Sequence, residues 1–566
     1  MTTPSPSFST PFMPSGPADA GSGAHASALL GPTHEVLNQP PPVPDYDAVT
    51  DDPVLVEGVA AFGGDPAELA RIGAAAGSQR ARESGRLADT HTPVLHTHDR
   101  FGNRIDEVEF HPAWHDLMGT AVGAGLHAAP WVAQSPGAHV ERAAGFMAWY
   151  QVEAGHGCPI SMTYAAVPAL QVDPEIGEAY IPGLASDTYD FGLRAPADKA
   201  GLIAGMAMTE KQGGSDVRAN TTRAFLDPAT GWYRLIGHKF FCSAPMSDLF
   251  LVLAQEGEAG LSCFVVPRVL PDGTRNPFAI QRLKDKLGNR SNASSEIEFA
   301  GTWAQRLGEP GRGVRTIVEM VSATRLDCVL GSAALMRRAL TDAGWHAAHR
   351  SAFGRSLVDQ PLMRTVLTDL AVEVEAAQWL GLRLAAAVDS GEDAFRRIAL
   401  PMSKYYVCKR APGQIFEAME ALGGSGYVED SGLPRLYREA PVNSIWEGSG
   451  SINALDLLRA LAREPETVDA WLTEIADVRG TDAVVDAALV GVLDAVAMAP
   501  DQLEPRARWL AEQMVTLLQT SVLQRYAPAA VAEAFVARRF SRTPATVGAT
   551  LATGDDEVLA RALIVS

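Results

Sequence analysis

The sequence predicts an α+β protein of several domains, ordered as helices, a compact β domain, and helices again. The chain has 566 residues, which is too long for one compact core. Apolar residues recur at three- and four-residue steps over much of 50–200 and again from Gly313 onward, as in amphipathic helices. Between these parts, over about 204–305, short β-prone runs alternate with turn signals.

These patterns divide the chain into six segments. Residues 1–33 are rich in Pro, Ser, Thr, Gly and Ala, and Asp19 is their only charged side chain, so a disordered tail is predicted. A stiff, extended proline-rich stretch lies at 39–44. The predicted domains are a helical N-terminal domain at 34–203, a β domain at 204–309, a helical bundle at 310–460, an extra helical region at 461–545 and a tail at 546–566.

The periodicity also predicts individual elements. In the N-terminal domain the clearest helices cover 51–61 and 138–153. Strands are expected at 232–236, 249–253, 261–266 and 296–299. In the bundle two apolar faces repeat at helical spacing, one formed by Val314, Ile317, Val318 and Val321, the other by Leu362, Val366, Leu370, Val374 and Ala377.

Composition restricts the class of protein. The net charge is −20 and the pI is about 5.1, which argues against nucleic acid as a main partner. The five cysteines are far apart and lack CxxC spacing, so reduced thiols in a cytoplasmic protein are expected. No run approaches the ~18–20 apolar residues that span a bilayer, and the N-terminus lacks the features of a secretory signal. No membrane partner is expected.

Five of the thirteen histidines fall between His91 and His115. HxH and HxxxH spacings occur there, but no cysteine is near, and Pro93 and Pro112 interrupt a common helical face. Surface or capping histidines are therefore favoured over a metal site, and no metal is predicted.

Two segments of the β domain are candidates for binding a cofactor. Met208 to Asp216 reads MTEKQGGSD, and its glycines allow backbone N–H groups to approach a flavin or a pyrophosphate. It fits neither a Rossmann fingerprint nor a Walker loop, and a simple turn into a strand is the alternative. Gly237 to Ser243 reads GHKFFCS, in which two adjacent aromatics could wall a flat ring. The alternative is a strand with one face in the core.

Two further segments lie in the helical part. Arg350 to Gly354 reads RSAFG, followed by Gln360, and its arginine could pair with a phosphate. A surface arginine in an interhelical loop is the alternative. Glu420 to Tyr427 reads EALGGSGY, which suits either a helix C-cap or close backbone approach to a nucleotide.

Glu447 is the candidate general base. It lies in Asn443 to Ser451, which reads NSIWEGSGS, between an indole and a glycine-serine loop. Trp446 favours partial burial, which would raise the pKa of the carboxyl group toward that of a working base. A surface carboxylate in a loop is the alternative.

Taken together, the segments MTEKQGGSD, HKFFCS, RSAFG with its downstream glutamine, LGGSGY and WEGSGS resemble the acyl-CoA dehydrogenase superfamily. The α–β–α order agrees with that resemblance. Further runs, FHPAWH at 110–115, RLKDKLGNRSNAS at 282–294 and LPRLYRE at 433–439, are similar to its adaptive-response, AidB-like branch. The resemblance is dense over about 34–460.

The resemblance implies FAD as the cofactor, bound against the β domain. The residues implied to contact it are Met208, Thr209, Gln212, Gly213, Gly214, Ser215, Phe240, Phe241, Cys242, Ser243, Ile445, Trp446, Gly448, Ser449, Gly450 and Ser451. Arg350, Phe353, Gln360, Gly423 and Gly424 match positions that reach the FAD of a neighbouring subunit, which implies a homo-oligomer, a tetramer in particular. The branch carries Asn where this chain has Ser451.

The resemblance also implies the reaction. An acyl-CoA thioester would be the substrate, and Glu447 matches the base that takes its α-proton while the β-hydride passes to the flavin. The cofactor would accept the hydride, and the protein would orient the substrate and adjust the pKa of the base.

The alternative is a DNA-binding flavoprotein of the response to alkylation damage. AidB-like proteins carry an added C-terminal helical region implicated in binding double-stranded DNA, and Arg459 matches a DNA-contact position. Arg525, Arg538, Arg539 and Arg542 could extend a basic face. However, 461–566 hold nine Arg, no Lys and fifteen acidic residues, a net charge of −6, and phosphate contacts dominate duplex affinity.

Overall fold

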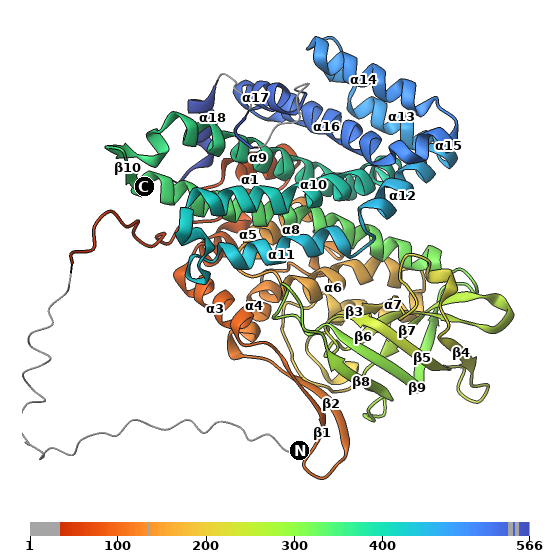
Figure 1. The fold of residues 1–566 in the computed structure, drawn as a ribbon. Coiled ribbons are helices and arrows are strands. Elements are labelled where there is room, and N and C mark those ends of the chain that lie inside the picture. The colour runs from red at the N-terminus through yellow and green to blue at the C-terminus, as the bar shows by residue number, and fades with distance from the viewer. Residues whose placement is uncertain (1–33, 134, 541–546, 550–553, 565–566) are drawn as a thin grey trace, which may run out of the picture.

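A computed structural model describes residues 34–133, 135–540, 547–549 and 554–564. The tail predicted at 1–33 lies outside these residues. The chain forms a central helical bundle, with the β domain below it and the extra helical region above it in the view of Figure 1. The N-terminal helices pack against the bundle, and one of them, α6 (Gly157–Leu170), also contacts the β domain.

The N-terminal domain is built mainly from helices. They are α1 (Pro53–Ala61), α2 (Ala70–Ala76), α3 (Gln79–Thr90), α4 (Pro112–Gly123), α5 (Ala138–Tyr150), α6 (Gly157–Leu170) and α7 (Pro174–Leu184). The helices predicted at 51–61 and 138–153 are confirmed as α1 and α5. The first begins at Pro53 because Asp52 is its N-cap and accepts a hydrogen bond from the Val54 N–H at 3.1 Å.

A strand pair was not predicted in this domain. β1 (Val94–His98) and β2 (Arg104–Glu109) form an antiparallel hairpin. Its turn is closed by Asp99, whose carboxylate accepts from the N–H groups of Phe101 and Asn103. The hairpin reaches the β domain, where the Ile280 N–H donates to Asp106 at 3.0 Å. The N-terminal domain is therefore not wholly helical.

The middle domain is a sheet that closes on itself. Its strands are β3 (Ala204–Ala207), β4 (Arg223–Leu226), β5 (Tyr233–Cys242), β6 (Leu249–Gln255), β7 (Leu261–Pro267), β8 (Phe278–Leu283) and β9 (Ser295–Leu307). The pairings run β6–β4–β5–β9–β7 and return to β6, with β3 added on β6 and β8 on β9. All four strands predicted in this region are present and all are longer than predicted, whereas β3, β4 and β8 are not among the predicted strands. β6 and β7 are buried along nearly their whole length, as expected of strands covered on both faces.

The bundle consists of long antiparallel helices. They are α8 (Gly313–His349), α9 (Pro361–Asp389), α10 (Asp393–Ala421), α11 (Leu433–Ile445) and α12 (Gly450–Arg463). A small hairpin, β10 (Ser351–Ala352) with β11 (Arg355–Ser356), connects α8 to α9. The two predicted apolar faces lie on α8 and α9, although Val318 and Leu362 are exposed. The helices are hydrophobic on several sides because neighbours surround them.

The extra region packs on the bundle as a second helical layer. It contains α13 (Pro465–Glu474), α14 (Ala483–Val496), α15 (Pro500–Leu503), α16 (Ala507–Tyr526) and α17 (Ala529–Arg539). α16 lies along α9 and α10. Its attachment is partly ionic, since Arg525 pairs with Glu474, which in turn pairs with Arg383 of α9 at 2.8 Å. Of the described residues, none lies in a helix long and apolar enough to cross a membrane.

The segment predicted as a C-terminal tail is partly folded. α18 (Asp555–Ala562) buries Val558, Leu559 and Ala562 against the bundle. Arg561 on the same helix pairs with Glu375 of α9 at 2.9 Å. The prediction of a tail is therefore wrong over 554–564, because a short helix with one apolar face is stabilised by the surface it covers and not by its length.

We expect Val558→Asp to detach α18, because a charge would be buried there without a partner. A loss of about 2 kcal/mol would lower the melting temperature by roughly 4–8 °C, and limited proteolysis would remove the C-terminal segment faster. Ala560→Asp, at an exposed position on the same helix, is the control. Equal melting temperatures for both variants would contradict this account of the docking.

Candidate active site

Glu447 lies in the three-residue loop 447–449 that follows α11 and its C-cap residue Trp446 and leads into α12. Its backbone is left-handed, with φ at 57°, and Gly448 follows with φ at 92°. A non-glycine residue in this region is uncommon and costs of the order of 1 kcal/mol or more, so surrounding contacts must maintain it.

Three side chains maintain this loop. Lys404 of α10 donates from Nζ to the carbonyl oxygens of Trp446, at 2.7 Å, and Gly448, at 2.6 Å. Asn453 of α12 also donates to the Gly448 carbonyl, at 2.6 Å. Arg325 of α8 donates from Nε to the carbonyl oxygen of Glu447 itself, at 3.2 Å. Residues from three helices thus fix the backbone on both sides of the carboxylate.

The surroundings of the Glu447 carboxyl group raise its pKa. One of its oxygens, Oε2, is buried and has no hydrogen-bond partner among the described residues. Burial raises the pKa of Glu447 above its ordinary value, while a hydrogen bond from Thr324 and the charges of Lys404 and Arg325 oppose the rise. The predicted effect of burial on this carboxyl group is therefore confirmed. The indole Nε1 of Trp446 is likewise buried and unpaired within the described part of the chain.

Cys158 of α6 connects this loop to the β domain. Ser243 lowers the pKa of this thiol and the negative charge of Glu447 raises it, so both residues lie within electrostatic range of Cys158. Burial, with a further contribution from Glu447, raises the pKa of Cys158 to about 12. The thiol is therefore neutral, and all three domains meet here.

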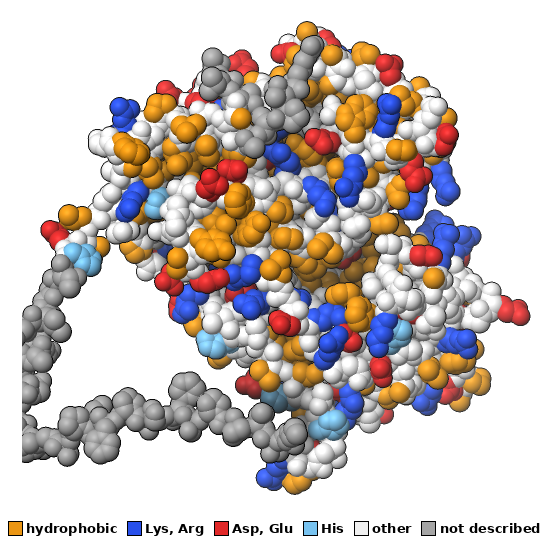
Figure 2. All heavy atoms as spheres, viewed as in Figure 1, with side chains coloured by type: hydrophobic (Ala, Val, Ile, Leu, Met, Phe, Trp, Pro, Cys, Tyr) orange, Lys and Arg blue, Asp and Glu red, His pale blue; other side chains and the backbone are white. Residues whose placement is uncertain are grey.

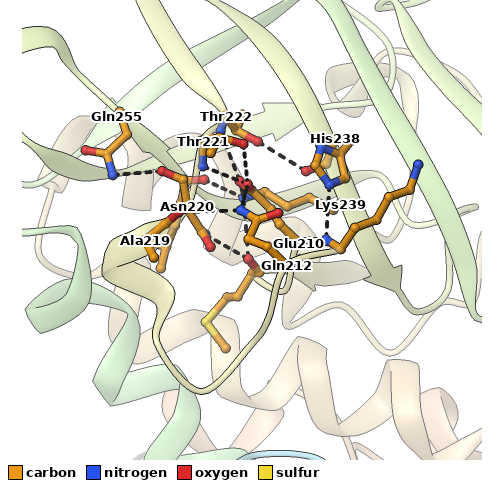
Figure 3. Close-up of polar contacts among 12 residues, drawn as sticks. Glu210, Gln212, Ala219, Asn220, Thr221, Thr222, His238, Lys239 and Gln255 are labelled. Carbon is orange, nitrogen blue, oxygen red and sulfur yellow. Dashed lines mark hydrogen bonds and ion pairs between the residues drawn. The ribbon is translucent and has the colours of Figure 1, made fainter.

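The glycine-rich segment after β3 rests on a buried ion pair. Glu210 and Lys239 are both fully buried, and their carboxylate oxygen and Nζ lie 2.8 Å apart (Figure 3). Burial alone would raise the pKa of Glu210, but the Lys239 ammonium and several hydrogen bonds hold it well below its ordinary value. The N–H groups of Thr221 and Thr222 donate to the same carboxylate at 2.7 and 3.1 Å.

This pair shapes the segment predicted to bind a cofactor. Gln212 donates to Glu210 at 2.7 Å, and the Phe240 N–H donates to the Thr209 carbonyl at 2.8 Å. Asn220 donates to the Met208 carbonyl at 2.9 Å. The predicted segments 208–216 and 237–243 are therefore side by side. Gly213 has φ at 152° and open space where a Cβ would be, so its backbone is accessible to a ligand, while Gly214 packs against Thr209.

The two aromatic rings predicted to wall a flat ligand, Phe240 and Phe241, are partly covered. Lys284 places its Nζ over the rings of Phe240 and Phe241, 3.5 and 4.4 Å from their centroids. The side chain of Cys242 is fully buried in the β core, so this residue could contact a ligand only through its main chain. The Ser243 hydroxyl faces Ser294 at 3.4 Å. Ser451 lies in the first turn of α12, where Arg508 of the extra region donates to its hydroxyl at 3.0 Å.

A second group of predicted residues lies far from Glu447. Arg350, Phe353 and Gln360 surround the β10–β11 hairpin at the far end of α8. From Thr324 to that end is about 38 Å at 1.5 Å per residue. Phe353 is 99% exposed and left-handed, and Gly423 and Gly424 have open space around them. One chain therefore does not bring this group to Glu447.

Sequence reasoning missed several residues at the site. Lys404, Arg325, Thr324 and Cys158 were not singled out, although a lysine inside the apolar run 398–408 is a detectable signal. The clustered histidines are used elsewhere: His91 stacks on His111, and His96 bonds Glu109 at 2.8 Å.

The expectation of an extended basic face is wrong for three arginines. Arg538 pairs with Asp555, Arg539 pairs with Asp369 and Glu373, and Arg525 pairs with Glu474. Arg538 and Arg539 are buried as well. Ion pairs across large sequence separations cannot be read from local composition. Arg459 keeps a side chain that is 58% exposed, and Arg542 lies outside the described residues.

Comparison with protein families identifies the class of protein. Residues 38–191 match the "Adaptive response protein AidB N-terminal domain", 205–302 match the "Acyl-CoA dehydrogenase, middle domain", and 311–462 match the "Acyl-CoA dehydrogenase, C-terminal domain". The fold and the order of its parts are those of acyl-CoA dehydrogenases.

Individual relatives agree. The chain is 49% identical over 465 residues to "Putative acyl-CoA dehydrogenase AidB" of Escherichia coli (strain K12), covering 81% of this chain and 86% of that protein. The structure of Caenorhabditis elegans ACDH-11 in complex with C11-CoA matches with a TM-score of 0.82 and 25% identity over 93% of this chain and 95% of that one. A Bacillus anthracis acyl-CoA dehydrogenase complexed with FAD shares the fold, with a TM-score of 0.61 and 18% identity over 80% of this chain and 82% of that one. The chain belongs to the acyl-CoA dehydrogenase family, in its AidB-like branch.

Breaking the Glu210–Lys239 pair should destabilise the protein strongly. We expect Glu210→Gln to cost about 3–5 kcal/mol, because it leaves the Lys239 ammonium buried and unpaired. Thermal unfolding measures this loss. The double variant Glu210→Gln/Lys239→Met removes both charges and should recover part of it. A double variant as unstable as the sum of the single variants would contradict the assignment of the loss to the unpaired charge.

Proposed function

We propose that this protein is a FAD-dependent acyl-CoA dehydrogenase in which Glu447 removes the α-proton of an acyl-CoA thioester. The observation that carries the proposal is the Glu447 loop: a carboxylate with a buried, unpaired oxygen, held in a left-handed conformation by Lys404 and Arg325. Family membership supplies the reaction class, and the acyl-CoA ligand of ACDH-11 supports the substrate class.

The residues present fit FAD. Open space beside Gly213 lets a ligand approach the backbone closely, and the Phe241 ring is about half exposed. The indole N–H of Trp446 is buried and has no hydrogen-bond partner among the described residues. Thr209, Ser215 and Ser243 supply hydroxyl groups. When bound, FAD supplies the hydride acceptor for the β-hydrogen.

The chain's own residues handle the proton. Glu447 must be ionised to accept it, and its burial makes the carboxylate a stronger base than an exposed one. The neutral thiols of Cys158 and Cys328, whose pKa values burial raises, do not compete for the proton. Fixing the loop at both flanking carbonyls keeps the carboxylate in one orientation, which avoids an entropic cost during reaction.

Replacing the base tests the proposal. Glu447→Gln keeps the size of the side chain and should slow flavin reduction by an acyl-CoA under anaerobic conditions by at least about 100-fold, while FAD remains bound. Absorbance near the flavin maximum in a stopped-flow instrument measures the rate. Equal rates for the variant and the wild type would rule out Glu447 as the base.

The proposal also fixes the direction in which the rate of flavin reduction changes with pH. The rate of flavin reduction should rise with pH through the pKa of Glu447, because only the ionised form accepts a proton. Since burial raises that pKa above its ordinary value of 4.5, the rate should already decline at a pH where an exposed glutamate is still ionised. A rate independent of pH down to the ordinary value would contradict the effect of burial.

We further propose that the working protein is a homo-oligomer, a tetramer on family grounds, in which a second copy brings its Arg350, Phe353, Gln360, Gly423 and Gly424 to the cofactor. Three observations support this. These residues lie far from Glu447 in one chain, and Phe353 and Tyr427 are exposed. In Figure 2, hydrophobic side chains also gather over α10 and α11, where Phe416 and Tyr437 are among those exposed.

Complementation between subunits tests this arrangement. Glu447→Gln and Arg350→Ala chains should each be inactive alone. Co-expressed, they should regain up to about a quarter of wild-type activity, because half the pairs are mixed and one of their two sites is intact. Tagged purification of mixed oligomers followed by flavin reduction measures this. No recovery in verified mixed oligomers would show that each site is complete in one chain.

The arginines of the C-terminal region do not favour DNA binding as a second function. Arg459 matches a DNA-contact position and is substantially exposed. Of the four arginines that could extend a basic face around it, three are neutralised by ion pairs and Arg542 lies outside the described residues. Duplex affinity rests on several phosphate contacts, so these observations favour the dehydrogenase.

A further inference from the structure

Lys404 is a buried cation in the bundle. Its side chain is fully buried in α10, and taking an ammonium group out of water is unfavourable unless it is compensated. Among the described residues, no carboxylate lies within ion-pair distance, 4.0 Å, of its Nζ. Its two hydrogen bonds instead go to the carbonyl oxygens of Trp446 and Gly448, at 2.7 and 2.6 Å.

These two carbonyls belong to the residues on either side of Glu447. One ammonium group therefore holds both ends of the peptide segment that turns into the left-handed region at Glu447. A methionine would fill a similar volume without the cost of burying a charge. The presence of lysine at this position calls for a role that depends on its charge.

The surroundings of Glu447 show what that charge acts on. The titratable and charged groups facing Glu447 are Arg325 and Cys328 from α8, Cys158 from α6 and Lys404 from α10. The two thiols are neutral. Arg325 is already paired with Asp456, 2.6 Å from its Nη1. Lys404 is thus the cation near Glu447 that has no carboxylate partner of its own among the described residues.

We propose that Lys404 is a positioning residue for the base: it holds the Trp446–Gly448 segment in place, and its charge balances the carboxylate of Glu447. This inference rests on the proposed function of Glu447. Lys404 does not contact substrate in this account, and it acts through the loop. Without it, the loop would lose its left-handed geometry and the carboxylate would retain its proton to higher pH.

The test compares Lys404→Met, Lys404→Arg and Lys409→Met as FAD-loaded proteins. Lys409 lies on the same helix but is exposed, so its variant controls for the loss of a lysine. In Lys404→Met, we expect the pH of half-maximal flavin reduction by acyl-CoA to rise by about one unit or more and the limiting rate to fall. Lys404→Arg should recover part of the shift, and Lys409→Met should match the wild type. An unchanged pH profile in a folded Lys404→Met protein would overturn the proposal.

A double-mutant cycle based on melting temperatures tests the role of Lys404 without an activity measurement. Melting temperatures of Lys404→Met, Glu447→Gln and the double variant give their coupling. We expect the double variant to be clearly more stable than the two single effects predict, and to fold even if Lys404→Met alone does not. Additive effects, or a double variant that fails to fold, would show that Lys404 is only structural. If no acyl-CoA reduces the wild-type flavin, the proposed function fails, and this cycle still tests the charge balance.

Discussion

The hydrogen bonds from the Lys404 ammonium to two loop carbonyls are the interaction on which the candidate active site depends. They connect the middle of the bundle to a loop that would otherwise relax from its left-handed turn. The carboxylate of Glu447 gains its properties from this arrangement. Burial strengthens it as a base, and nearby cations keep it from becoming permanently protonated.

A buried lysine also organises the part of the candidate site that lies in the β domain. There, the buried pair of Glu210 and Lys239 organises the backbone of the glycine-rich segment, and four donors besides Lys239 converge on the Glu210 carboxylate. A buried ion pair contributes little net stability but is costly to break. Each half of the site is therefore shaped by a buried lysine, and Cys158 lies where the two halves meet.

The sequence predicts the architecture well where the periodicity is strong. Four strands of the β domain and the helices α8 and α9 follow from local patterns, whereas β3, β4 and β8 are not predicted. The hairpin at 94–109 was missed because its first strand, Val94 to His98, is partly exposed and mixed in character. The packing of α18 was missed because a short helix depends on the surface that it covers.

For the candidate site, the order of motifs predicts Glu447 and the glycine-rich segment. Lys404 was not predictable in the same way, since its partners are carbonyl groups more than forty residues away, which carry no side-chain signal. The arginines of α16 and α17 were misjudged for a related reason: Glu373 and Glu474, which neutralise them, lie on other helices. Long-range pairing of charges is a property of the fold and not of local sequence.

The proposed function requires Glu447 to remove an α-proton during the α,β-dehydrogenation of an acyl-CoA. Product analysis tests it most directly: the FAD-loaded protein is incubated with acyl-CoA thioesters of graded chain length and an artificial electron acceptor, and products are identified by mass spectrometry. The account predicts a thioester lacking two hydrogens with the wild type and almost none with Glu447→Gln. If no acyl-CoA loses two hydrogens, or if both proteins give equal yields, the account is contradicted.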